Sequence, residues 1–359
     1  MERFNIYKRR DGRWEGRIAK GKNRNGTRQF QYFFGKTREE TQKKMAEIRR
    51  KSQNGCCFLS ITQLFNEWMR SIKHLVKEST AANYFLKAQK HILPAFGKMQ
   101  VEALESADVY SFIELKQQSG LSNRYISDII IVMKTLFKYA VRTYHIFNPM
   151  IDIELPRKKS SDIKLLDSND QDKLQLFIHN HQNRASLGVA LSMATGIRIG
   201  ELCALQWEDI DFEKRILTVR KTIQRIQTPR EKRKTKLVIT EPKSESSKRK
   251  IPIPECVVEF LKKFRGKAKE FIVSGKNKPF EPRTMQYRFS KILKNAKLPS
   301  VHFHALRHIF ASNCIKLGFD VKSLSELLGH SSVEITLNRY VHSSFEQKRE
   351  YMKRLNLAF

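Results

Sequence analysis

The sequence predicts an α+β protein of several domains: a small three-stranded sheet with a helix, a helical bundle, and a mixed, mainly helical domain with a small β-sheet. The chain has 359 residues, enough for two or three domains. Hydrophobic residues make up 40% of it, which argues against a disordered chain. Hairpin signals near the start, helical spacing in the middle and a mixture of both afterwards divide the chain into three parts.

Residues 1–51 are predicted to form the sheet and its helix. Asp-Gly at 11–12 and Asn-Gly at 25–26 each separate two short runs that are rich in aromatic and aliphatic residues. Both dipeptides are strong hairpin signals, because the two central residues of a type I′ turn have positive φ. Thr37 is then expected to cap a helix, with a glutamate three residues later completing a capping box.

Residues 59–150 are predicted to form the helical bundle. We expect helices at about 61–73, 80–92, 106–118 and 122–144. The last of these carries apolar residues with a 3.6-residue period. Pro94 and Gly97 mark one break between helices and Gly120 marks another, and Pro149 ends the bundle.

Residues 163–359 are predicted to form the third, mixed domain. We expect helices at about 166–180, 184–195, 255–265, 282–296, 304–317, 320–328 and 331–341. Strands are expected at 216–227 and 236–254, with a heavily basic stretch between them.

The chain is strongly basic, with 69 Lys and Arg against 36 Asp and Glu and a formal net charge of +33. Such an excess repels itself in a compact protein, and a polyanion relieves the repulsion. No stretch approaches the roughly 20 apolar residues that span a bilayer, and no signal peptide follows Met1. The five cysteines lack the spacing of a disulfide framework or a zinc site. We therefore expect a cytoplasmic protein that binds DNA or RNA and no membrane.

Four segments of the third domain hold residue types that can carry chemistry. The first places an arginine between two glycines, where a backbone can approach another group closely. The second is a basic hairpin, the third reads His-x-x-Arg, and the fourth runs from Leu-Gly-His to a tyrosine. The residues of interest are Arg198, Glu201, Lys243, His304, Arg307, His330 and Tyr340.

Together these segments resemble the tyrosine recombinases, also called phage-type integrases. The resemblance covers nearly the whole chain and is most specific over residues 190–345. It implies that residues 163–359 are a catalytic domain, preceded by a helical core-binding domain. The N-terminal module resembles the arm-binding domain of integrases from phages and conjugative transposons.

The resemblance implies a site-specific DNA recombinase, or integrase, that acts through a covalent 3′-phosphotyrosine intermediate. Cleaving a phosphodiester needs a nucleophile, a charge clamp and an acid for the leaving oxygen. Tyr340 is expected to attack the phosphorus, while Arg198 and Arg307 hold phosphate oxygens through planar donors that stay charged. Lys243 is expected to protonate the leaving 5′ oxygen. This chemistry requires no ATP, metal or other cofactor.

Two histidines and a glutamate complete the expected site. His304 is suited to take the tyrosine proton because its ordinary pKa lies near neutrality. His330 is expected to donate to the phosphate, and Glu201 to orient a cationic or imidazole partner. His304 and His308 stand one helical turn apart, but Arg307 between them would repel a cation, so no metal site is expected.

Each assignment has a plain structural alternative. Tyr340 shares a helical stripe with Val333 and Leu337, as a core tyrosine would. Arg198 and Glu201 are also spaced for an ordinary intrahelical ion pair. The hairpin offers four other basic residues in place of Lys243, namely Lys236, Lys248, Arg249 and Lys250.

The expected partner is double-stranded DNA with attachment sites of arm and core type. Candidate arm-site contacts are Arg13, Arg17, Arg28 and Gln31, and candidate core-site contacts are Lys77, Ser79, Lys134 and Lys138; each is equally typical of an ordinary solvated side chain. The resemblance further implies a homo-tetramer on DNA, with the amphipathic segment 343–359 packing on a neighbouring subunit. It also implies a directionality factor, a host DNA-bending protein and a place in the bacterial nucleoid.

Two rival functions share these residues. A type IB topoisomerase-like enzyme has a similar active site, although the separate sheet and bundle disfavour it. A catalytically inactive DNA-binding regulator would keep the same fold, but every expected side chain is present.

Overall fold

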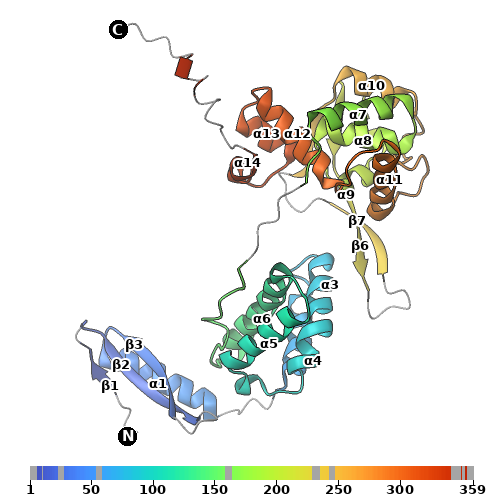
Figure 1. Cartoon of the computed structure of the whole chain (residues 1–359). Helices are drawn as coiled ribbons and strands as arrows, with labels where there is room; N and C mark the ends of the chain where they lie inside the picture. The colour runs from blue at the N-terminus through green and yellow to red at the C-terminus, as the bar shows by residue number, and fades with distance from the viewer. Residues whose placement is uncertain are drawn as a thin grey trace, which may run out of the picture. The chain divides into compact units, whose positions relative to one another are not determined.

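The chain forms two compact units, Met1–Ser160 and Ser161–Phe359. The computed structural model describes residues 6–9, 11–22, 28–53, 59–157, 164–228, 235–241, 247–340, 349 and 352–353. The first unit holds the small sheet and the helical bundle, and the second holds the mixed domain (Figure 1). The predicted α+β, multidomain fold class is confirmed.

A three-stranded antiparallel sheet opens the first unit. Its strands are β1 (Ile6–Lys8), β2 (Trp14–Lys22) and β3 (Arg28–Gly35), paired in that order. Helix α1 (Arg38–Gln53) covers one face so closely that a Cβ atom on Gly16 would lie 2.2 Å from Met45 Sδ. Gly12 in the β1–β2 turn has a φ of +83°, the backbone conformation for which a hairpin turn selects glycine.

The cap of α1 differs slightly from the predicted capping box. Thr37 Oγ1 accepts a hydrogen bond from the backbone N–H of Glu40 at 3.1 Å, as expected. The carboxylate of Glu40, however, accepts from the backbone N–H of Lys36 at 2.8 Å, one residue before the cap. The first bond satisfies an N–H group that the start of a helix leaves without an intrahelical partner, and the second ties down the residue before the cap.

The helical bundle packs around a core of its own. Its α-helices are α2 (Ile61–Ile72), α3 (Glu78–Lys87), α4 (Leu93–Phe96), α5 (Ser106–Gln118) and α6 (Asn123–Tyr144). A short 3₁₀ helix, η2 (Val101–Ala103), joins α4 to α5. Helix α6 buries the apolar stripe that its 3.6-residue period predicts, including Ile126, Ile130, Met133 and Phe137.

The break predicted at Pro94 and Gly97 falls at Gly97, where α4 ends, and not at Pro94. Helix α3 continues into a π-helical segment, η1 (Ala88–Ile92), and then into α4, where Pro94 occupies the first turn. Proline is tolerated there because the π-helical turn before it interrupts the regular α-helical hydrogen bonds, as the bond from the Leu93 N–H to the Ala88 carbonyl shows. His91 lies buried in η1 with its ring edge-on to Tyr125. Burial, together with nearby lysines, holds the pKa of His91 below its ordinary value.

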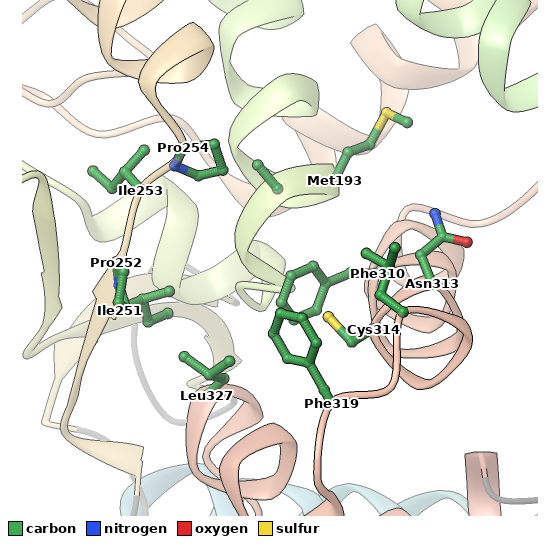
Figure 2. Close-up of a pocket in the computed structure, with 12 residues that line it drawn as sticks. Met193, Ile251, Pro252, Ile253, Pro254, Phe310, Asn313, Cys314, Phe319 and Leu327 are labelled. Carbon is green, nitrogen blue, oxygen red and sulfur yellow. The ribbon is translucent and has the colours of Figure 1, made fainter. Parts of the chain in front are cut away.

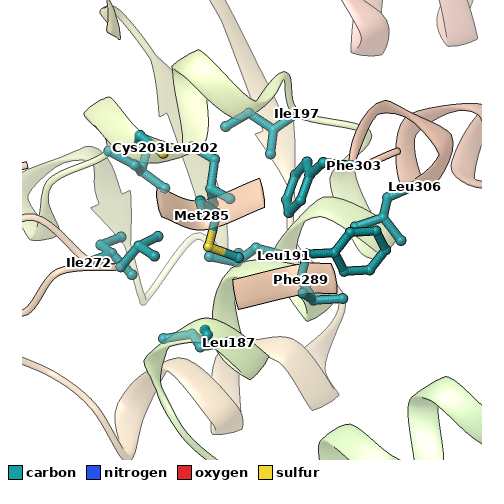
Figure 3. Packing of buried hydrophobic residues seen from close by; sticks show 14 of the residues in the cluster. Leu187, Leu191, Ile197, Leu202, Cys203, Ile272, Met285, Phe289, Phe303 and Leu306 are labelled. Carbon is teal, nitrogen blue, oxygen red and sulfur yellow. The ribbon is translucent and has the colours of Figure 1, made fainter. Parts of the chain in front are cut away.

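The second unit surrounds one large hydrophobic core. Its helices are α7 (Ser168–Asn180), α8 (Arg184–Thr195), α9 (Ile199–Ala204), α10 (Glu255–Lys262), α11 (Pro282–Asn295), α12 (His304–Lys316), α13 (Val321–Leu328) and α14 (Val333–Tyr340), with a 3₁₀ turn, η3 (Trp207–Asp209). Figure 3 shows Leu191 of α8 packed among Met285 and Phe289 of α11 and Phe303 before α12. This packing fixes the helices that carry the candidate site.

The strands of the second unit divide more finely than the sequence predicts. The predicted strand 216–227 is two strands, β5 (Ile216–Val219) and β6 (Thr222–Gln227), and the predicted strand 236–254 yields β7 (Thr235–Thr240) and β8 (Arg249–Pro252). With β4 (Ile210–Asp211), the order of one sheet is β4-β5-β8, while β6 and β7 pair separately. In the sequence, the β6–β7 hairpin is therefore inserted between β5 and β8, which are neighbours in the β4-β5-β8 sheet.

Across the part of the chain that the structure describes, no helix combines the length and the apolar composition that a bilayer crossing requires.

Candidate active site

Arg198 lies in the turn between α8 and α9. Gly196 ends α8 with a φ of +62°, and a Cβ atom at that position would lie 2.5 Å from the ring of Phe310. Gly200, the second glycine, lets α9 approach β6, since a Cβ there would lie 2.7 Å from the carbonyl oxygen of Ile223. Both glycines that flank Arg198 are thus required by close packing, which supports the interpretation of this segment from the sequence.

Glu201 is buried between two arginines. It is 3% exposed, and its Oε1 atom accepts a hydrogen bond from Arg198 Nη1 at 2.9 Å. Its Oε2 atom accepts one from Arg249 Nη2, also at 2.9 Å. Burial by itself raises the pKa of this carboxyl group, but Arg249 and Arg198 outweigh burial and hold the pKa below its usual value. Glu201 is therefore a carboxylate at neutral pH.

Three arginines converge on the C-terminal end of α13. The bonds are Arg249 Nε to the Leu327 carbonyl (2.6 Å), Arg307 Nη2 to the Leu328 carbonyl (2.6 Å) and Arg198 Nη2 to the Gly329 carbonyl (2.9 Å). The last carbonyl groups of a helix lack intrahelical donors and carry partial negative charge, so they suit cationic donors. Segments that are far apart in the sequence are joined here, directly before His330.

Arg307 and His304 both belong to α12, but their surroundings differ. Arg307 is 2% exposed and also donates from Nη1 to the Gly196 carbonyl at 2.7 Å, which ties α12 to the turn before Arg198. His304 is the first residue of α12 and is exposed. Its ring meets that of His308 edge-on, with 4.9 Å between the ring centroids.

His330 follows the arginine cluster directly. Its Nδ1 atom lies 2.8 Å from the hydroxyl oxygen of Thr336, a fully buried residue of α14. A hydroxyl group that holds Nδ1 fixes the orientation of the imidazole ring.

Tyr340 is the last residue of α14, and its side chain lies outside the described residues. Val333 is 39% exposed and Leu337 is 42% exposed, whereas Thr336 is fully buried and marks the buried side of α14.

Lys243 falls in segment 242–246, outside the described residues. Among its sequence alternatives, Arg249 is committed to the Glu201 carboxylate and the Leu327 carbonyl. The sequence interpretation missed the role of Arg249 and the contact of Thr336. The role of Arg249 had one signal in the sequence. It lies two residues before Ile251 in a predicted strand, so the two side chains share a face, and Ile251 is buried.

An apolar pocket of about 570 Å³ shares Leu327 with the arginine cluster. Figure 2 shows residues 251–254 on one side, with Phe310, Phe319 and Leu327 facing them. Burial raises the pKa of the Cys314 thiol in its wall to about 11, so the thiol is uncharged at neutral pH. Among the described residues, no group of three or more potential metal ligands is suitably placed.

The arm-site candidates divide between the two faces of the N-terminal sheet. Arg13 and Arg17 are exposed, and their guanidinium groups lie over the rings of Phe34 and Phe30 at 5.8 and 5.0 Å. Gln31 alternates with exposed Tyr32 and stands on the same face as Phe33, the face that α1 covers. The backbone of Arg28 pairs with that of Lys22, and its side chain lies outside the described residues.

The core-site candidates in the bundle also differ from one another. Lys77, at the start of α3, and Lys138, on α6, are exposed, whereas Ser79 is half-buried. Lys134 donates from Nζ to the Ile153 carbonyl at 2.7 Å. Its ammonium group therefore holds the chain segment that follows α6.

Comparison with known proteins finds two family matches. Residues 164–347 match the model of the phage integrase family, and residues 60–115 match that of the phage integrase N-terminal SAM-like domain. The chain is 28% identical to a XerC-like tyrosine recombinase of Caldanaerobacter subterraneus, with 95% of each chain covered. It is 24% identical to the ICEBs1 integrase of Bacillus subtilis, covering 89% of this chain and 90% of the relative.

Among solved structures, the chain is similar to the integrase of transposon Tn1549 in complex with a circular intermediate DNA. The two share 25% sequence identity and a TM-score of 0.69. The match covers 83% of this chain and 99% of the solved one.

Proposed function

The chain belongs to the phage integrase family, and we propose that it integrates and excises a mobile element through a 3′-phosphotyrosine at Tyr340. It is a tyrosine site-specific recombinase. The observation that carries the proposal is the convergence of Arg198, Arg307 and Arg249 directly before His330. Fixed cations beside a histidine are suited to stabilise the negative charge of a phosphate during cleavage.

Arg198 and Arg307 hold the non-bridging oxygens of the scissile phosphate. Arg198 is suited to the first contact, because 35% of its side chain is exposed while its guanidinium group is already oriented. Arg307 is buried, and its bonds to the Gly196 and Leu328 carbonyls fix the position of the site as a whole. Positive charge held in place before DNA arrives need not be reorganised during the reaction.

Tyr340 Oη attacks the phosphorus, and the bond from phosphorus to the 5′ oxygen breaks. The tyrosine proton passes to His304, and Lys243 protonates the departing 5′ oxygen, so the step ends with a phosphotyrosine and a 5′ hydroxyl. His330 donates from Nε2 to a phosphate oxygen. A 5′ hydroxyl from another strand then reverses the step, which rejoins the DNA without ATP or metal.

Two further modules bind the DNA around the core site. The N-terminal module, residues 1–51, binds arm-type sequences with the sheet face that carries Arg13 and Arg17. The bundle, residues 59–150, binds core-type sequences together with the catalytic domain, residues 163–359. The formal charge of +33 favours contact with phosphates along the whole chain. Directionality and DNA bending are supplied by separate proteins.

Recombination joins four subunits on two DNA sites. The apolar pocket beside Leu327 is a suitable place for segment 343–359 of a neighbouring subunit, which carries Met352, Leu355, Leu357 and Phe359. An empty apolar surface gains stability when another apolar segment covers it.

Covalent trapping tests the proposal. Nicked duplexes tiled across both ends of the encoding element are incubated with the protein and separated on a denaturing gel. We expect a retarded protein–DNA band that Tyr340→Phe abolishes, while Tyr287→Phe, which alters an exposed tyrosine of the same unit, retains it.

The same gel separates the rival functions. Binding without an adduct on every tiled duplex would indicate an inactive DNA-binding regulator. An adduct together with relaxation of supercoiled DNA, but no exchange between two sites, would indicate a topoisomerase-like enzyme.

A further inference from the structure

We infer that Arg249 is a positioning residue of the recombination reaction. It acts through Glu201, which it shares with Arg198, and so sets both the orientation of Arg198 and the net charge of these three side chains. This inference rests on the proposed function, because it concerns how Arg198 meets the scissile phosphate. Arg249 lies on β8, in the basic segment of the sequence where it was one of the alternatives to Lys243. It reaches Arg198 only through the shared carboxylate.

The geometry leaves Arg249 little freedom. Its side chain is 6% exposed, and three different nitrogen atoms donate hydrogen bonds. The acceptors are the Leu327 carbonyl for Nε at 2.6 Å, the Ser247 carbonyl for Nη1 at 3.1 Å and Glu201 Oε2 for Nη2 at 2.9 Å. A planar guanidinium group held at all three nitrogens fixes the carboxylate that it contacts.

Charge balance gives Arg249 its role. Arg198, Glu201 and Arg249 carry one net positive charge while both arginines are present. Without Arg249, the buried carboxylate neutralises Arg198 alone, and the pair presents no net charge to an anionic phosphate. Because a buried charge without compensation is costly, Glu201 would also draw Arg198 more strongly toward itself.

Arg249 also connects separate parts of the site. Ser247 is the first described residue after segment 242–246, which contains Lys243, and Leu327 ends the helix before His330. One side chain therefore contacts Ser247, the carboxylate that holds Arg198 and the end of the helix before His330. A merely structural residue would make the contacts with Ser247 and the helix without the charge coupling.

A rescue experiment separates the two roles. We measure the rate of phosphotyrosine adduct formation at saturating DNA for Arg249→Met, Glu201→Gln and the double variant. We expect Arg249→Met to slow the reaction by about 10- to 100-fold, as removal of an orienting partner does. Glu201→Gln should slow the wild type but speed the Arg249→Met protein at least about threefold, since it restores the single net charge.

Two further variants test whether the charge of Arg249 is what matters and whether the effect is specific to this ion pair. Arg249→Lys keeps the charge and should lie between the wild type and Arg249→Met. Arg220→Met is the matched control, because Arg220 also pairs with a buried carboxylate, Asp209, at 2.9 Å, and should keep most of the rate. An Arg249→Met protein with an unchanged rate, or one that Glu201→Gln slows further, would overturn the inference.

The charge coupling is also measured without DNA. Arg249→Met should flatten the loss of stability in acid, because Glu201 loses a cation that holds its pKa in the folded protein below the unfolded value. An acid limb with an unchanged slope contradicts the inference, whatever the protein does on DNA. Absence of any wild-type adduct on the tiled duplexes contradicts the proposed function instead.

Discussion

His330 Nδ1 lies 2.8 Å from the hydroxyl oxygen of Thr336, so the helix that carries Tyr340 also holds the histidine that precedes it. Thr336 is wholly buried on α14, six residues after His330. The contact fixes which ring nitrogen faces the protein. It also makes the position of α14 and the orientation of His330 depend on one another.

Thr336→Val should therefore slow phosphotyrosine formation while the protein stays folded. Valine keeps the shape of threonine but lacks the hydroxyl group, and losing one such hydrogen bond costs about 1 kcal/mol, or roughly fivefold in rate. Thr336→Ser keeps the hydroxyl group and should remain near the wild-type rate. Single-turnover cleavage of a nicked duplex measures both, and equal rates for the two variants would contradict the assigned contact.

Gly200→Ala should destabilise the second unit and slow cleavage together. The added Cβ atom would lie 2.7 Å from the Ile223 carbonyl, so α9 must move away from β6 and carry Glu201 with it. Overpacking of this kind costs about 1–3 kcal/mol, which thermal unfolding detects. Gly188→Ala is the control, because the one tight contact of its Cβ atom would be the flexible end of Met285 at 2.9 Å, while Leu202 and Val273 lie at the ordinary contact distances of 3.4 and 3.5 Å. A milder effect at position 200 than at 188 would rule out the tight α9–β6 contact.

Glu201 should make stability depend on pH only in acid. Its pKa in the folded protein lies below the ordinary value of 4.5, so its contribution is complete above about pH 4.5 and is lost as the pH falls through the folded pKa. Glu201→Gln should flatten this acid limb and leave the neutral range without any new slope. Denaturant unfolding between pH 3 and 8 measures the effect, and identical acid slopes for both proteins would refute it.

Lys134 and Lys138 should behave differently although they lie one helical turn apart on α6. Lys138 is exposed, and Lys138→Met should lower the salt dependence of DNA binding by about one charge if it contacts a phosphate. Lys134 is bound to the Ile153 carbonyl, so Lys134→Met should lower the melting temperature and leave the salt slope unchanged. Binding titrations at several salt concentrations and thermal unfolding make the comparison. A reduced salt slope for Lys134→Met would show that its ammonium group serves DNA instead.

Much of the fold could be predicted because its signals are local. The hairpin turn at Gly12, the cap at Thr37 and the apolar stripe of α6 each depend on residues within a few positions of one another. Pro94 was misleading because a proline alone does not show whether the helix around it ends or continues. Here a π-helical segment precedes it and the helix continues to Phe96.

The sheets depended on contacts that a local pattern does not contain. Alternating residues over 216–227 predict one strand, but β5 pairs with β8 and β6 pairs with β7, which separates them at residues 220–221. The face on which Gln31 lies could not be predicted from local pattern either. A shift of one residue along β3 moves a side chain from the open face to the face under α1, and strand register is set by the partner strand.

The sequence by itself determined the family, the order of the three modules and the residue types that the chemistry requires, because motif spacing and charge are properties of the chain. Only the tertiary structure decided which groups bind one another. Arg249 reaches Glu201 across 48 positions, and Arg198 reaches the Gly329 carbonyl across 131. Hydrogen bonds to carbonyl groups exposed at the end of a helix depend on where that helix packs, and packing brings together segments that no spacing in the sequence connects.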